Sequence, residues 1–296
     1  VASLNGVVMR YASISGRLAG LGADKWAVHI EGRRRMAAGT DMIMLSIGEP
    51  DLPPPAAVLD AATDAMRGGR TKYADGQGER SARSAIAAML TRRSGLPVGD
   101  RDVVCMSGTQ HGIFATLATL VEEGDEVLVP DPFYATYEGV IAATGAKFVS
   151  VPTLPEDNFH LTAAAVERAV TPRTRVLLLN NPSNPTGAVL TAEEIDAIGE
   201  VCIRHDLWIV CDEVYAAMTY GVEFHSPFDR PRLRDRSVSV ASISKSHALP
   251  GFRCGWAACP PDLAPRLTLV VETMLFGSQP FLADATAVAL ATDHPE

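Results

Sequence analysis

From about residue 100 onward, short apolar runs alternate with stretches of helical periodicity, and this alternation limits the fold more than any other feature. The runs are rich in β-branched residues and apolar almost throughout, as in strands buried on both faces; they span 103–106, 126–129, 147–151, 175–179, 207–211 and 238–243. Helical stretches separate most of them, at 110–121, 137–144, 162–170 and 192–205. Strand alternating with helix predicts an α/β fold with a mainly parallel central sheet sandwiched by helices.

The N-terminal part is organised differently. Residues 1–45 are expected to form an arm, or part of a small domain, and 46–296 a large domain, with a second small domain starting near residue 290. Five of the residues from Gly48 to Pro55 are glycine or proline, which indicates a loop with a fixed path. Helices are predicted at 24–38, 56–66, 81–93 and 281–292, and the sequence Thr191-Ala-Glu-Glu194 predicts a capping box for the helix at 192–205.

Composition excludes several classes of protein. Hydrophobic residues make up 47% of the chain and charged residues 21%, which is ordinary for a globular protein. The net charge of −9 argues against a nucleic-acid binder that relies on phosphate contacts. The five cysteines are an odd number without framework spacing. Cys202, His205 and Cys211 lack the second half of a zinc site, so Cys202 and Cys211 are interpreted as buried thiols. No signal peptide or apolar span is visible in the sequence, so a cytoplasmic location is expected.

In a parallel sheet, ligands bind beyond the carboxyl ends of the strands. The loops that follow the predicted strands hold nearly every reactive or turn-forming residue of this part of the chain; they cover 107–111, 131–134, 180–187, 212–215 and 242–246. This clustering is the strongest indication of an enzyme that the residues alone give.

Four features of these loops suit one cofactor. Lys245 follows an apolar strand, and a lysine amine at a strand end can form a Schiff base. Asp212 ends a buried run and requires a cationic partner, such as a protonated ring nitrogen. Arg253 can bind a phosphate bidentately, and Gly108-Thr-Gln110 offers free N–H groups at a helix start. An aldehyde, a pyridinium and a phosphate are the groups of pyridoxal phosphate, whereas P-loop, dinucleotide and G-x-S-x-G signatures are missing.

The motifs resemble the class I/II aminotransferases, the fold-type-I group of enzymes that use pyridoxal 5'-phosphate (PLP). They occur in the order and at the spacing of that family between Ser46 and Gly277; they are Asn181-Pro-Ser-Asn-Pro-Thr-Gly187, Asp212-Glu-Val-Tyr215, Ser242-x-Ser-Lys245 and Gly251-x-Arg-x-Gly255. Within the family, Ser244 to Ala248, His205 to Trp208 and Met274 to Ser278 look most like arginine–pyruvate and related broad-specificity enzymes.

The resemblance implies a role for each matching residue. Lys245 would hold the cofactor as a Schiff base and move the Cα proton, and Asp212 would keep the pyridine nitrogen protonated. Tyr215 and Asn184 would bind the phenolic oxygen of the ring, and Tyr134 would stack on it, with Phe133 as the alternative one residue away. The expected phosphate-binding residues are Gly108, Thr109, Gln110, Ser242, Ser244 and Arg253.

Two further roles concern the substrate and a second subunit. Gly48 and Asn184 would contact the substrate, and Tyr73 would reach the phosphate bound by the other subunit of a homodimer. Members of the family continue into a small C-terminal domain that supplies an arginine for the substrate carboxylate. No residue here takes that role, so we expect the small domain to be missing or incomplete and the chain to be part of a longer protein.

Other interpretations remain open at this point. Taken singly, Asp212 is compatible with a helix cap, Asn184 with a turn, and the tyrosines with core aromatics. His111 and His247 are expected to be structural. The alternative reactions on the same framework are those of a carbon–sulfur β-lyase or an aminocyclopropane-carboxylate synthase, and the alternative class is the ligand-sensing domain of a transcription regulator, which the short arm disfavours.

Overall fold

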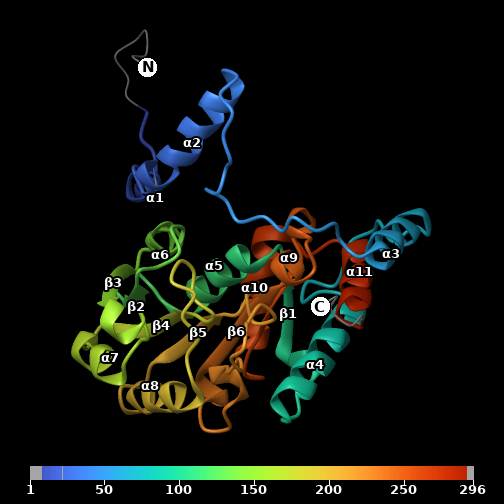
Figure 1. Ribbon diagram of the computed structural model, residues 1–296. Coiled ribbons are helices and arrows are strands. Elements are labelled where there is room, and N and C mark those ends of the chain that lie inside the picture. The colour runs from blue at the N-terminus through green and yellow to red at the C-terminus, as the bar shows by residue number, and fades with distance from the viewer. Residues whose placement is uncertain (1–8, 22, 292–296) are drawn as a thin grey trace.

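A seven-stranded sheet forms the centre of the molecule in a computed structural model that describes residues 9–21 and 23–291 (Figure 1). The strand order is β1-β7-β6-β5-β4-β2-β3. The strands are β1 Val103–Met106, β2 Glu126–Asp131, β3 Lys147–Pro152, β4 Thr174–Asn180, β5 Trp208–Asp212, β6 Ser237–Ser242 and β7 Gly255–Ala258. All neighbours pair in parallel except β7, which is antiparallel to both β1 and β6. The predicted mainly parallel sheet is confirmed, and β7 is the strand that the sequence pattern did not reveal.

Helices cover both faces of this sheet (Figure 1). The described helices are α1 Ser13–Leu18, α2 Ala23–Ala37, α3 Ala56–Arg67, α4 Arg80–Ser94, α5 Thr109–Leu120, α6 Tyr137–Thr144, α7 Ala163–Ala169, α8 Ala192–Arg204, α9 Ile243–Ser246, α10 Ala264–Leu275 and α11 Pro280–Ala291. Short 3₁₀ turns lie at Asp100–Asp102, Pro155–Asp157, Pro227–Asp229, Arg234–Arg236 and Pro250–Phe252. The predicted helices are found within two residues of their expected ends, whereas α1, α9 and α10 were not predicted.

The side chains of each strand alternate between two cores, because successive residues of a strand point to opposite faces. On β4, Val176 and Leu178 pack with α5, α6 and α10, whereas Leu177 and Leu179 pack with α7 and α8. At the other end of the sheet, Trp256 and Ala258 of β7 face α3, α4 and α11. Burial on both faces explains why the strands have nearly uninterrupted apolar sequences.

Hydrogen bonds connect the arm and the segment that follows it to the rest of the molecule. Arg17 of α1 donates a 2.9 Å hydrogen bond from Nε to the carbonyl of Ala142 in α6. After α2 the chain runs extended toward α3, passing over the sheet's helices (Figure 1), and Gly48 meets Lys245 on the way. The division into an arm at 1–45 and a large domain at 46–296 stays a prediction, and residues 1–8, 22 and 292–296 lie outside the described part.

Two local predictions are confirmed, namely the capping box of α8 and the burial of Cys202 and Cys211. The capping box of α8 forms as expected: the Glu194 N–H donates to Thr191 Oγ1 at 3.2 Å, and the Thr191 N–H donates to Glu194 Oε2 at 2.8 Å. Cys202 and Cys211 are buried free thiols. Among residues 9–21 and 23–291, no group of metal-ligating side chains gathers and no helix is long and apolar enough to cross a bilayer.

Candidate active site

Ten of the predicted site residues line one cavity of about 160 Å³ at the carboxyl ends of the parallel strands. They are Thr109, Gln110, Tyr134, Asn184, Asp212, Tyr215, Ser242, Ser244, Lys245 and Arg253. Asn180, Val214 and Pro250 complete the lining. Residues from five separate loops therefore meet in one place, although more than 140 positions separate the first from the last in the chain.

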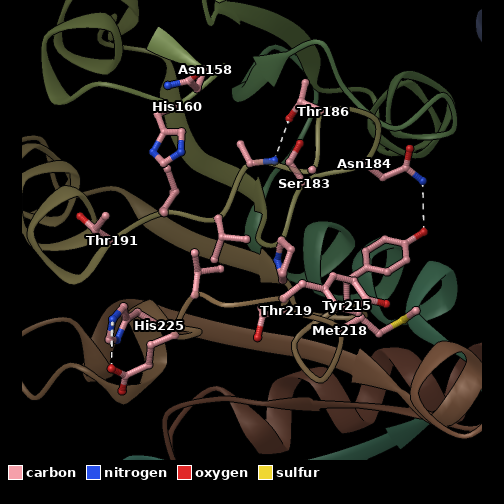
Figure 2. Close-up of a pocket in the computed structure, with 18 of the residues that line it drawn as sticks. Asn158, His160, Ser183, Asn184, Thr186, Thr191, Tyr215, Met218, Thr219 and His225 are labelled. Carbon is pink, nitrogen blue, oxygen red and sulfur yellow. Dashed lines mark hydrogen bonds and ion pairs between the residues drawn. The ribbon is translucent and has the colours of Figure 1, made fainter. Parts of the chain in front are cut away.

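A larger cavity of about 930 Å³ lies beside this one (Figure 2). The two share Asn184 and Tyr215, whose side chains point toward each other in Figure 2. The larger cavity is lined mainly by apolar groups and holds neither Lys245 nor Asp212. The chemistry of the site therefore belongs to the smaller cavity.

Asp212 is a buried carboxylate at the end of β5, with 5% of its surface exposed. Its Oδ2 accepts a 2.8 Å hydrogen bond from the phenol of Tyr137, and its Oδ1 accepts from the Val214 N–H at 3.1 Å. Burial raises the pKa of Asp212 to about 6, although both hydrogen bonds lower it. Within the described part of the chain, no cationic side chain forms an ion pair with it. Such a carboxylate suits a cationic group of a ligand.

Tyr215 and Asn184 form a pair on one wall of the cavity. The Asn184 Nδ2 donates to the Tyr215 hydroxyl at 3.1 Å, as the dashed line in Figure 2 shows. Asn180 holds this pair in place from the end of β4: its Oδ1 accepts from the Asn184 N–H at 2.6 Å, and its Nδ2 donates to the Asp212 carbonyl at 3.1 Å. Burial raises the pKa of the Tyr215 phenol.

The start of α5 forms one end of the cavity. Its N-cap, Gly108, has φ +83° and provides no side-chain cap, so the first N–H groups of the helix are available to a ligand. The Thr109 hydroxyl donates to Ser242 Oγ at 2.9 Å, and the same Oγ accepts from the Ser244 N–H at 3.3 Å. Hydroxyls, helix N–H groups and a guanidinium therefore meet at this end.

Two glycines allow Arg253 to reach this helix start. A Cβ added at Gly108 would lie 2.4 Å from Arg253 Nη2, and one added at Gly255 would lie 2.7 Å from the carbonyl carbon of Gly108. The guanidinium donates to the carbonyls of Pro250 and Ser107 at 2.9 and 3.2 Å. Because β7 returns antiparallel at this point, Arg253 comes to the same edge as the parallel strands.

Lys245 lies on the short helix α9 that follows β6 and not on the strand itself. Its Nζ donates a 2.6 Å hydrogen bond to the carbonyl of Gly48, and this contact brings the segment after the arm to the cavity. The two aromatic candidates, Tyr134 and Phe133, pack differently. Tyr134 lines the cavity with its ring edge-on to Tyr137, whereas the ring of Phe133 packs against Phe148 with centroids 4.7 Å apart.

Tyr73 lies outside the cavity. Its side chain is 86% exposed and its ring packs against Phe276, with centroids 5.0 Å apart. The two histidines beside the site loops are held by backbone groups. His247 is buried and its Nε2 lies 2.8 Å from the carbonyl of Ala289, and the Ser107 N–H donates to Nδ1 of His111 at 3.3 Å. Burial lowers the pKa of His111.

Sequence reasoning missed two side chains that shape the site. Tyr137 was read only as the start of a helix, and Asn180 only as part of a loop. Asn180 could have been found, because it is the polar residue that ends the buried strand β4, as Asp212 ends β5. Tyr137 carries no such signal, because it reaches Asp212 only through the packing of α6.

The fold and the site define an enzyme of amino-group transfer. The sequence profile of the family described as aminotransferase class I and II matches residues 40–296, and the chain belongs to this family. The enzymes of the family transfer an amino group between amino acids and 2-oxo acids.

Individual relatives support this family assignment. The chain is 41% identical over 288 residues to the arginine–pyruvate transaminase AruH of Pseudomonas aeruginosa, covering 97% of this chain and 73% of that protein. It is 37% identical to an aspartate aminotransferase of Geobacillus stearothermophilus, covering 82% of this chain and 62% of that one. The aspartate aminotransferase from Thermus thermophilus with maleate superposes with a TM-score of 0.89 at 31% identity, covering 95% and 73% of the two chains. The chain thus spans about two thirds of the length of these relatives.

Proposed function

We propose that this protein is a PLP-dependent aminotransferase that moves an amino group from an L-amino acid to a 2-oxo acid in two half-reactions. One observation carries the proposal. A single cavity gathers a lysine amine, a buried carboxylate without a cation, a tyrosine–asparagine pair and an anion-binding helix start.

The residues fit PLP group by group. Asp212 suits a protonated pyridine nitrogen, because a buried carboxylate is costly to keep charged unless a cation accompanies it. The phosphate would be held by the N–H groups from Gly108 to Gln110, the hydroxyls of Ser242 and Ser244, and the Arg253 guanidinium. Tyr215 and Asn184 would bind the phenolic oxygen, and Tyr134 would cover the ring face.

When bound, PLP would supply an aldehyde that combines with amines and a cationic ring that accepts electron density from the substrate Cα–H bond. Lys245 would anchor the aldehyde at its Nζ. Once released, its amine would take the proton from the substrate Cα as a general base and deliver it to the former aldehyde carbon, C4′, as a general acid. Asp212 would hold the proton on the ring nitrogen throughout. The hydroxyl of Tyr215 would set the charge of the phenolic oxygen, because it can both donate to it and accept from Asn184.

The names of the relatives suggest which amino-group donor and acceptor to test. Arginine and pyruvate are the first pair to test, since the name of the AruH relative states them. Gly48 and Asn184 would contact the substrate, and the protein would form a homodimer in which Tyr73 of the partner subunit completes the phosphate site. The 86% exposure of Tyr73 supports a role outside its own subunit.

The test is an absorbance spectrum of the protein with added PLP, followed by single amino acids without an acceptor. A visible band that Lys245→Ala abolishes and Lys147→Ala leaves intact would support the lysine assignment, because Lys147 is an exposed residue of β3. Conversion of the band by an amino acid, with release of its 2-oxo acid, would support transamination. If ammonia and pyruvate form from cystathionine without an acceptor, the reaction is that of a carbon–sulfur β-lyase and not transamination. If no band appears at all, the PLP assignment is wrong.

A further inference from the structure

Glu213, the residue next to Asp212, is a second buried carboxylate, with 1% of its surface exposed. The two side chains point to opposite faces of the sheet, as consecutive residues at a strand end do. Asp212 faces Tyr137 of α6, whereas Glu213 faces α4 on the other side. No role in the proposed reaction uses Glu213.

Three side chains donate hydrogen bonds to Glu213. Its Oε2 accepts from Arg93 Nη1 at 2.8 Å and from the Ser239 hydroxyl of β6 at 2.6 Å, and its Oε1 accepts from the Ser226 hydroxyl. Arg93 is one of two arginines in the last turn of α4. Its guanidinium also binds Asp229 in a bidentate manner, through Nε at 2.7 Å and Nη2 at 2.9 Å.

Arg93 therefore joins three segments that are far apart in sequence. It connects α4, the turn after β5 and the 3₁₀ turn Pro227–Asp229, and the ring of Phe224 covers it with the centroid 5.2 Å from Cζ. The turn that it holds is the one that carries Asp212 and Tyr215 into the cavity. The Ala216 N–H closes this turn by donating to the Glu213 carbonyl at 2.9 Å.

We propose that Arg93 is a positioning residue for the cofactor site: by binding Glu213 and Asp229 together it fixes the turn that presents Asp212 and Tyr215, and it offsets the charge of Glu213 beside the Asp212 carboxylate. This inference rests on the proposed function. Burial is the largest cause of the raised pKa of Asp212, and the negative charge of Glu213 raises it further. Arg93 can therefore influence Asp212 through Glu213. A cation bound directly to Glu213 weakens that repulsion across the short distance between adjacent residues.

Other titratable or charged groups also face Asp212, and they are the same in the unmodified protein and in a variant of Arg93. Tyr137 of α6 contacts it, and four further groups line the same cavity: Tyr134, Tyr215, Lys245 and Arg253. Because none of them contacts Arg93 through a hydrogen bond, a change at Arg93 acts on Asp212 only through Glu213 and the turn.

The experiment measures PLP binding to the apo-protein by quenching of tryptophan fluorescence, from about pH 5 to about pH 8, which brackets the pKa of Asp212. In the unmodified protein, affinity should fall as the pH drops through about 6, where the Asp212 carboxylate takes up a proton. Arg93→Met should move the midpoint of this fall to higher pH and weaken binding about tenfold near neutral pH. Arg93→Lys should restore most of the affinity, because it keeps the charge.

Two matched variants separate charge from structure. Arg92→Met is the control for Arg93→Met, because Arg92 is the exposed neighbour on the same helix turn, and it should leave the midpoint unchanged. Glu213→Gln should move the midpoint to lower pH, whereas Asp229→Asn, which removes the other carboxylate bound to Arg93, should not.

The outcomes are distinct. If Arg93→Met lowers affinity by one factor at every pH, or if Glu213→Gln and Asp229→Asn behave alike, Arg93 has no charge effect on Asp212 and the inference is wrong. If Arg93→Met does not fold, the comparison of Glu213→Gln with Asp229→Asn decides alone. If the unmodified protein binds no PLP, the proposed function fails before the inference is tested.

Discussion

The phenol of Tyr137 donates a 2.8 Å hydrogen bond to the carboxylate of Asp212, and both side chains are buried. The bond joins α6 to the end of β5 and is the only side-chain hydrogen bond to this carboxylate in the described part of the chain. It lowers the pKa of Asp212, which burial raises to about 6. The Tyr137 phenol therefore opposes the effect of burial on the charge state of Asp212 near neutral pH.

Tyr137→Phe should raise the pKa of Asp212 above about 6, because it removes a hydrogen bond that stabilises the charged form. Fewer molecules then carry the carboxylate at neutral pH, and PLP affinity should fall about tenfold, as expected for a lost hydrogen bond to a charged group. Binding titrations at about pH 7 and about pH 8.5 check this, and the deficit should shrink at the higher pH. Tyr11→Phe, at an exposed position, is the control. An equal deficit at both pH values would contradict the pKa explanation.

Asp212→Asn should stabilise the apo-protein while it weakens PLP binding. The folded-state pKa of about 6 lies above the ordinary value of 3.8, so the folded form binds the proton more tightly than the unfolded form. The carboxylate therefore begins to cost stability as the pH rises above 3.8, and the cost reaches its full size above about pH 6. The difference corresponds to about 3 kcal/mol when the group is fully charged, an upper bound for this substitution. Urea unfolding of the apo-protein should show a gain near pH 8 that is absent near pH 4. A loss of stability at pH 8 would show that the carboxylate has a folding partner in the apo-protein.

Gly255→Ala should destabilise the protein by about 2–4 kcal/mol, because the new Cβ would lie 2.8 Å from the Gly108 Cα and 2.8 Å from the Ala241 carbonyl oxygen, and backbone cannot move aside cheaply. The matched change is Gly139→Ala in α6, where nothing lies within 4 Å of the added carbon and the helix should gain up to about 1 kcal/mol. Denaturant midpoints of the two variants measure the contrast. Equal midpoints would mean that β7 can move away from the start of α5.

Tyr73→Ala and Lys245→Ala should complement each other if Tyr73 acts across a dimer interface. Each variant alone should be nearly inactive. A hybrid dimer has one site with both native residues, because a two-fold interface exchanges the same residues between subunits. Mixing the two after mild dissociation should therefore restore a fraction of the amino-transfer rate. Hybrid formation is verified by mass. If the hybrid then recovers no activity, Tyr73 does not act across the interface, and either it acts within its own subunit or it has no role in the site.

The parallel part of the fold was predictable because each of its strands is an apolar run long enough to stand out, such as the run that ends at Asp212. The short strand β7 was not, because its four residues follow a glycine-rich motif that reads as a loop. The cavity residues were predictable where they follow strands directly or match family motifs. Tyr137 and Arg93 could not be predicted, because Tyr137 contacts Asp212 and Arg93 contacts Glu213 from helices whose positions are set by packing and not by their own sequences.

The contact between Lys245 and Gly48 has a consequence for the timing of events at the site. The amine that donates to the Gly48 carbonyl is the amine that would carry the cofactor, so it cannot serve both partners without rearrangement. Loading the cofactor then frees the backbone around Gly48 from its anchor on α9. Deuterium uptake by the peptide covering 46–52 should accordingly rise when PLP is added, and the same rise should occur without cofactor in Lys245→Ala. The extended segment after α2 would thus report the occupancy of the site to the arm that precedes it.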